Sequence, residues 1–118
     1  MKRFSIVSAV VAAGAMVLSI MPAQAADPGV TATEIKLGVS TPLTGSAGLA
    51  YGKVPGAMKA YFDYINANGG VYGRKIKLVV RDDKYLPTLA ATHTTNLILK
   101  DNVFALVGAL GTATHSKA

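Results

Sequence analysis

Strongly apolar runs alternate with helical patterns along the chain from residue 34 onward. Residues 34–40 begin with alternating polar and apolar positions, residues 75–82 change from alternating to continuously apolar, and residues 103–107 are apolar throughout. Period-two alternation predicts a half-buried strand, whereas a short continuous apolar run is typical of a strand covered on both faces. We therefore predict three strands. The last is expected to be buried on both faces, and the second to pass from a half-exposed position into the interior.

Two helices are predicted between these strands. The first begins at Val54 or Pro55, because proline is well tolerated in a first helical turn, and it ends in the Asn-Ala-Asn-Gly-Gly sequence of residues 66–70. The second covers residues 88–100 and follows Pro87. The first helix should bury one face, at i, i+3 and i+4 spacing, against the core. That face comprises Ala57, Ala60, Tyr61, Tyr64, Ile65 and the Ala67/Asn68 position.

The order strand, helix, strand, helix, strand predicts a parallel sheet, because helical crossovers of this length join parallel strands. The fold class is therefore α/β, as part of a doubly wound parallel sheet. Ligands of such sheets bind at the carboxyl ends of the strands. Two loops follow strand ends at that edge, residues 41–52 and residues 109–114, and we expect them to face the same crevice.

Residues 1–25 have the pattern of a secretory signal peptide. A short basic start precedes an almost wholly apolar or small stretch over residues 5–20, and an Ala-x-Ala pattern ends at Ala25. A membrane anchor is the alternative, but the apolar run is shorter than the roughly 20 residues that a spanning helix needs. We expect cleavage after Ala25, followed by a loosely held N-terminus over residues 26–33.

Composition narrows the candidate functions. The chain has 12 Lys and Arg against 6 Asp and Glu, and without Lys2 and Arg3 of the signal peptide 10 basic residues face 6 acidic ones, a net charge of +4. The basic residues are dispersed, so we expect a solvated surface and no nucleic-acid partner. The chain has no cysteine, which excludes disulfides and thiolate metal sites, and its two histidines lack a metal-binding spacing. We expect no metal and no cofactor.

Two motifs approach catalytic patterns without meeting their requirements. Residues 47–53 nearly fit a Walker A loop, but Val54 stands where magnesium binding needs Ser or Thr. Asp82 and Asp83 are adjacent, and neighbours in an extended segment point to opposite faces. We therefore favour helix capping or loop ordering over an acid–base pair or a metal site. Because no nucleophile–base pair is evident, we expect no enzyme, and a small secreted enzyme is the least favoured alternative.

The two loops at the carboxyl edge offer the side chains of a binding site. Residues 41–52 supply the aromatic Tyr51, and residues 109–114 supply the hydroxyls of Thr112 and Thr114. An aromatic wall together with hydroxyl and amide donors suits a small carboxylate that bears an apolar side chain. The alternative is that one of the two threonines only caps the next helix, and the two roles are compatible.

Several segments together resemble one known family. The most specific reads Ile-Asn-Ala-Asn-Gly-Gly-Val-Tyr-Gly-Arg over residues 65–74, and a strand and an Asp-Asp pair follow it. The other matching segments are residues 35–39, 42–45, 60–64, 80–83 and 103–108. In this combination the sequence resembles the N-terminal part of periplasmic substrate-binding proteins of ABC transporters, of the branched-chain amino-acid (Leu/Ile/Val-binding) type.

The resemblance implies two α/β lobes that are joined by a hinge, close over a ligand and present it to an ABC permease in the inner membrane. It implies that Thr112, with Ala113 and Thr114 adjacent, contacts the α-carboxylate of the ligand, and that Tyr51 contacts its side chain. The expected function is periplasmic solute binding for uptake of amino acids or related small carboxylates. A ligand-sensing extracytoplasmic domain of the same fold is the alternative.

Proteins of this family are several times longer than this chain. Residues 34–118 would then be the incomplete N-terminal part of the first lobe, and we expect a truncated form. Such a form has an unpaired, exposed sheet edge. We also expect weak ligand binding, or none, by this fragment alone.

Overall fold

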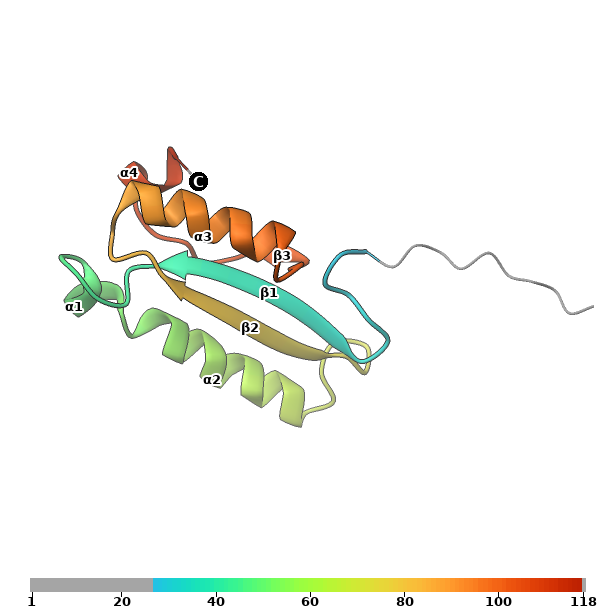
Figure 1. Cartoon of the computed structure of the whole chain (residues 1–118). Helices are drawn as coiled ribbons and strands as arrows, with labels where there is room; N and C mark the ends of the chain where they lie inside the picture. The colour runs from blue at the N-terminus through green and yellow to red at the C-terminus, as the bar shows by residue number, and fades with distance from the viewer. Residues whose placement is uncertain (1–26, 118) are drawn as a thin grey trace, which may run out of the picture.

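The computed structural model describes residues 27–117, in which three parallel strands form one sheet (Figure 1). The strands are β1 (Glu34–Thr41), β2 (Lys75–Asp82) and β3 (Ala105–Leu106), in the order β2-β1-β3. β1 pairs with β2 from Glu34↔Lys75 to Thr41↔Asp82, and with β3 at Leu37↔Ala105 and Gly38↔Leu106. The predicted α/β fold with a parallel sheet is confirmed. The predicted signal peptide lies outside the described residues.

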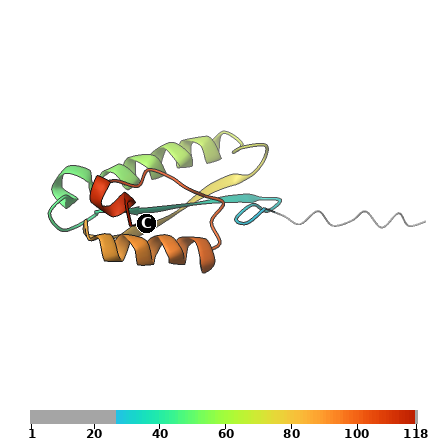
Figure 2. The same ribbon diagram turned by 90° about the horizontal axis from the view of Figure 1, so that it is seen from above.

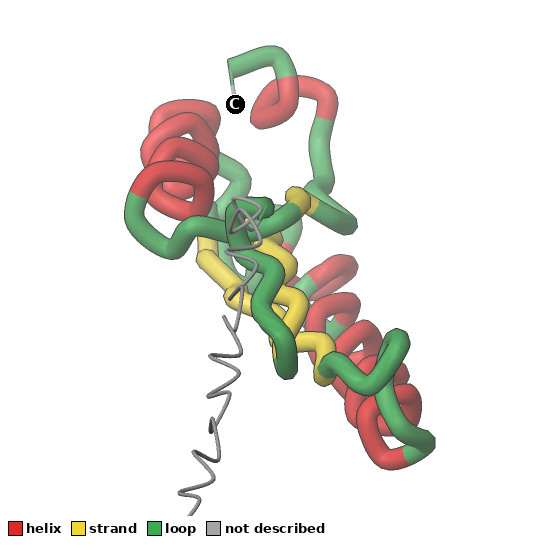
Figure 3. Tube along the Cα trace, turned by 90° about the vertical axis from the view of Figure 1, so that its right-hand side faces the viewer, coloured by secondary structure: helices red, strands yellow, loops and turns green. Residues whose placement is uncertain are grey.

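Two long helices cover opposite faces of this sheet, α2 (Val54–Ala67) and α3 (Pro87–Leu99) (Figures 1 and 2). Figure 3 shows the same layers from the side, with the strands between the two helices. Each helix has proline in its first turn, as predicted. Two short helices, α1 (Gly48–Tyr51) and α4 (Thr112–His115), follow β1 and β3 at the same end of the sheet. None of the described helices is long and apolar enough to cross a membrane.

The core of the described residues lies between β1 and α3. Val39 and Leu97 are fully buried, and Val103 and Ala90 are almost so. Gly38 allows this close packing, because a Cβ at that position would lie 3.1 Å from both Leu97 Cδ2 and Val103 Cγ1.

The face that α2 turns to the sheet differs from the predicted one. Tyr61 and Tyr64 are 62% and 64% exposed, and Ala57 and Ala60 are exposed as well. The more buried side of the helix carries Pro55, Met58, Phe62, Ile65 and Asn66. Of the predicted stripe, only Ile65 belongs to that side.

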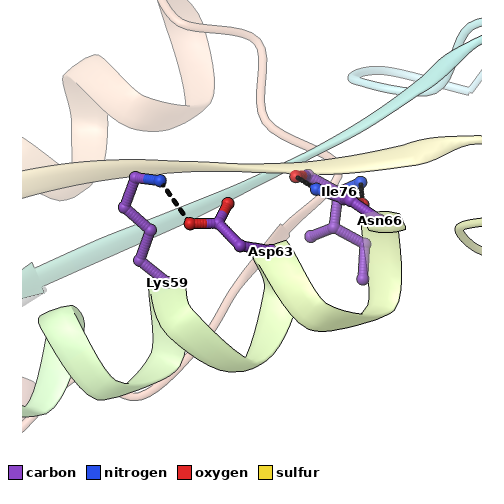
Figure 4. Close-up of polar contacts among 4 residues, drawn as sticks. All are labelled: Lys59, Asp63, Asn66 and Ile76. Carbon is purple, nitrogen blue, oxygen red and sulfur yellow. Dashed lines mark hydrogen bonds and ion pairs between the residues drawn. The ribbon is translucent and has the colours of Figure 1, made fainter. Parts of the chain in front are cut away.

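A polar side chain fixes this orientation of α2. Asn66 Nδ2 donates to the carbonyl of Ile76 at 2.8 Å, and the Ile76 N–H donates to Asn66 Oδ1 at 2.7 Å (Figure 4). Figure 4 also shows the Lys59–Asp63 ion pair, 2.7 Å long, along the same side of the helix, where both side chains remain exposed. Because Asn66 binds the backbone of β2 twice, the helix rotates so that this residue faces the sheet.

The last strand is shorter and less covered than predicted. β3 comprises two residues, and while Val103 before it is 7% exposed, Phe104 and Leu106 are 51% and 42% exposed. β2 also runs along an edge of the described sheet, and Val80 is 36% exposed. The predicted burial of residues 103–107 on both faces is wrong, and so is the predicted passage of β2 into the interior. Within residues 27–117, β2 and β3 are the two edge strands of the sheet, and each pairs only with β1.

Candidate functional site

Loops that follow the carboxyl ends of all three strands line one open cavity of about 580 Å³. Its lining residues are Ser46, Ala47, Ala50, Tyr51, Tyr85, Leu110, Gly111 and Thr112. The predicted pair Tyr51 and Thr112 therefore lies at one end of the sheet and lines the same cavity. None of the lining side chains is charged, so the cavity offers hydroxyl groups, backbone groups and two aromatic rings.

Asp82, at the end of β2, orders the loop that follows β1. Its Oδ1 accepts hydrogen bonds from the N–H groups of Leu43 at 2.9 Å and Lys84 at 3.0 Å, and its Oδ2 accepts one from the Thr44 hydroxyl at 2.6 Å. Burial acts to raise the pKa of Asp82. The Thr44 hydroxyl and the backbone donors outweigh burial and lower this pKa from 3.8 to about 2. The ionised carboxylate therefore ties the loops after β1 and β2 together.

Asp83 has a separate set of partners and orders the loop after β2. It is 1% exposed, and it accepts hydrogen bonds from the Ser40 hydroxyl at 3.0 Å and from the Tyr85 N–H at 2.9 Å. Lys84 and Tyr85 both adopt positive φ angles, 53° and 64°, which are uncommon for residues other than glycine. The predicted loop-ordering role of Asp82 and Asp83 is confirmed by these bonds. No group of three or more potential metal-binding side chains is found among residues 27–117.

The loop after β3 approaches Tyr85 closely at Gly111. Gly111 has a φ of 111°, and a Cβ there would lie 2.5 Å from Tyr85 Cε2 and 2.6 Å from Thr114 Oγ1. Only glycine fits both the backbone angle and the space. Any side chain larger than that of glycine at position 111 would therefore collide with Tyr85 or Thr114.

Thr112, Ala113 and Thr114 differ in their surroundings. Thr112 is exposed and lines the cavity, whereas Ala113 is exposed without lining it. Thr114 is 2% exposed, and its hydroxyl donates to the carbonyl of Leu110 at 2.6 Å, with the Gly111 carbonyl at 3.0 Å. The N-cap residue of α4 is Gly111, with no side-chain cap, so neither threonine caps this helix. Thr114 supports the loop that presents Thr112.

Sequence reasoning missed Tyr85 as a lining residue. Its position alone could have indicated the role, because it follows the carboxyl end of β2, next to β1 in the sheet. Ala50 was missed for a different reason: α1 folds residues that were predicted to be irregular, and it presents Ala50 and Tyr51 together. Ser46 and Ala47 also line the cavity and lie just before this helix.

Residues 34–118 match the family described as periplasmic binding protein. The chain belongs to this family, whose members are binding proteins and not enzymes, and membership implies a location outside the cytoplasm. An amino acid binding protein of Pseudomonas aeruginosa is 40% identical over 77 residues, which are 64% of this chain and 20% of that protein.

Solved structures of the family share the fold. A fatty acid ABC transporter substrate-binding protein from Thermomonospora curvata is 39% identical with a TM-score of 0.68, over 76% of this chain and 23% of that one. The branched-chain amino acid transporter substrate binding protein LivJ from Streptococcus pneumoniae, in complex with isoleucine, is 34% identical with a TM-score of 0.68, over 73% and 25%. The chain thus spans a fifth to a quarter of the length of these relatives and forms part of one lobe.

Proposed function

We propose that this chain supplies one side of the ligand site of a periplasmic solute-binding protein for ABC-type uptake, whose ligands are amino acids or related small carboxylates. The observation that carries the proposal is that Tyr51 and Thr112, from loops after different strands, line one uncharged cavity. The partner that receives the ligand is an ABC permease in the inner membrane.

The chemistry of the lining residues suits such a ligand. The Thr112 hydroxyl can donate to a carboxylate, and the N–H groups of Thr112 and Ala113 have no partner within α4 because they begin that helix. The Tyr51 ring, 41% exposed, offers an apolar surface to the ligand side chain. In this arrangement Thr114 positions the loop, while Asp82 holds the loop that leads to Tyr51.

The ligands named for two relatives have the same two parts. Isoleucine, named in the Streptococcus pneumoniae structure, and a fatty acid, named for the Thermomonospora curvata protein, each join a carboxylate to an apolar group. The ligands of these two relatives support the proposal that this chain binds a small carboxylate with an apolar side chain. Isoleucine has an amino group and a fatty acid does not. We therefore propose that the Thr112 loop binds the carboxylate, which both ligands have.

The proposal is tested by following the amide signals of the ¹⁵N-labelled chain by NMR during titration with L-isoleucine. We expect shifts at residues 46–51 and 110–113, with a Kd weaker than about 1 mM because only one side of the site is present. L-isoleucinamide, which lacks the carboxylate, should give none of these shifts. The proposal fails if the Thr112 amide does not respond, or if it responds equally to the amide.

A variant isolates the hydroxyl of Thr112. Thr112→Val keeps the shape of the side chain and should weaken isoleucine binding about 2- to 10-fold, the value of one hydrogen bond. Thr92→Val is the matched control, because Thr92 is an exposed threonine of α3 outside the cavity. Equal effects of the two substitutions would contradict a role for Thr112 in binding.

A further inference from the structure

We propose that Tyr85 is a second aromatic contact for the ligand and that it makes the site prefer a carboxylate with an aromatic side chain over an aliphatic one of similar size. This inference rests on the proposed function, since it concerns the same cavity. Tyr85 comes from the loop after β2, so it adds a third loop to the two that carry Tyr51 and Thr112.

The backbone of Tyr85 is held in place. Its N–H donates to Asp83 Oδ1 at 2.9 Å, and Asp83 is itself buried and bound by the Ser40 hydroxyl at 3.0 Å. The N–H of Leu86 donates to the Asp83 carbonyl at 2.8 Å. These bonds accompany positive φ angles at Lys84 and Tyr85, a conformation that is uncommon for residues other than glycine. A ring on such a backbone loses little conformational freedom when a ligand binds.

The ring of Tyr85 is also held from one side. Gly111 leaves just enough space for it, because a Cβ at Gly111 would lie 2.5 Å from Cε2 and 3.3 Å from Cζ of Tyr85. The ring thus packs on the backbone of the loop that presents Thr112. Tyr85 lines the same cavity as Thr112, the residue proposed to bind the ligand carboxylate.

The two tyrosine rings of the cavity do not contact each other. Among residues 27–117, the aromatic ring pair in contact is Tyr61 with Phe62 on α2, whose centroids are 6.4 Å apart. Tyr51 and Tyr85 both line the same open cavity, so a ligand in it is within reach of both residues. An aromatic side chain in this space can make stacked or edge-to-face contacts with both rings, which a branched aliphatic side chain cannot do.

The test compares L-phenylalanine with L-leucine, using the Thr112 amide shift of the chain to obtain both dissociation constants. We expect phenylalanine to bind about 2- to 10-fold more tightly than leucine, the range of one additional aromatic contact. Tyr85→Leu should abolish this preference, and Tyr85→Phe should retain it. Both variants keep an unbranched Cβ, so the positive φ disfavours them equally.

Tyr72→Leu is the matched control, because Tyr72 also has a positive φ, 49°, and is 96% exposed outside the cavity. It should leave the preference unchanged. If Tyr85→Leu keeps the wild-type preference while Thr112 still responds, this inference is overturned and the proposed function stands. If no carboxylate shifts the Thr112 amide of the wild-type chain, both are overturned.

A measurement on the wild-type chain covers the case in which Tyr85→Leu does not fold. Intermolecular NOEs between the phenylalanine ring and the ring protons of Tyr85 are expected, together with NOEs to Tyr51. Their absence at Tyr85, with the NOEs to Tyr51 present, would overturn the inference.

Discussion

The carboxylates of Asp82 and Asp83 are neighbours in the sequence but hold different parts of the site. Asp82 binds the loop after β1 through Leu43 and Thr44, whereas Asp83 binds β1 at Ser40 and the backbone of Tyr85. Neighbours in an extended segment point to opposite faces, and the two carboxylates have no hydrogen-bond partner in common. The pair therefore positions two lining loops without being part of the cavity lining.

Asp82 should make stability depend on pH in acid. Its pKa is about 2 in the folded chain, below the ordinary value of 3.8, so its contribution is complete above about pH 4 and is lost as the pH falls toward 2. Solvent screening limits this contribution to about 1 kcal/mol at pH 7. We expect Asp82→Asn to lower the free energy of unfolding by this amount at pH 7, and by almost nothing at pH 2, in urea titrations followed by circular dichroism.

Asp63→Asn is the control for this experiment. Asp63 pairs with Lys59 on α2, but both side chains are well exposed, at 59% and 69%. Such a pair contributes at most about 0.5 kcal/mol. A pH-independent difference between Asp82→Asn and the wild type would contradict the role assigned to the ionised carboxylate.

At the scale of the elements, the pattern of the sequence was sufficient for type and order but not for orientation. Alternation identified β1 and β2, and proline in the first turn located the starts of both long helices. The prediction of which face of α2 is buried is wrong, because Asn66, a polar residue, faces the sheet whereas Tyr61 and Tyr64 do not. Apolar periodicity cannot detect a face that two hydrogen bonds to a strand determine.

Whether both faces of a strand are buried is another property that the strand's own residues do not determine. Residues 103–107 are apolar on both alternating faces, yet Phe104 and Leu106 are about half exposed. A continuous apolar run shows that a strand tolerates burial on both sides. Whether it is buried depends on neighbours in space, and the described residues supply them on one face only.

We expect the packing of α3 against β1 to make the largest contribution to the free energy of unfolding. Leu97 is fully buried against Gly38 and Val103, so Leu97→Ala should destabilise the chain by about 2–5 kcal/mol. Leu99→Ala, two residues along α3, is the control: Leu99 is 75% exposed, and the expected change is within about 0.5 kcal/mol. Thermal unfolding measures both, and similar losses for the two variants would show that the core does not lie here.

For the whole molecule, the candidate site is a surface built by three strand ends. The sequence alone predicted that Tyr51 and Thr112 share an edge, because both follow carboxyl ends of parallel strands. It could not predict how Tyr85 and Gly111 meet, since that contact depends on two positive φ angles and on Asp83. The cavity is open, so binding is expected to be weak.

In the proposed site, one ligand contacts Tyr51 and Thr112 at the same time. Isotope-filtered NOE spectra of the labelled chain with unlabelled L-isoleucine detect this contact. We expect NOEs from the ligand methyl groups to the Tyr51 ring, together with a shift of the Thr112 amide at the same isoleucine concentrations. NOEs to the exposed Tyr61 or Tyr64 of α2 in place of Tyr51, or a Thr112 shift with no NOE to Tyr51, would contradict it.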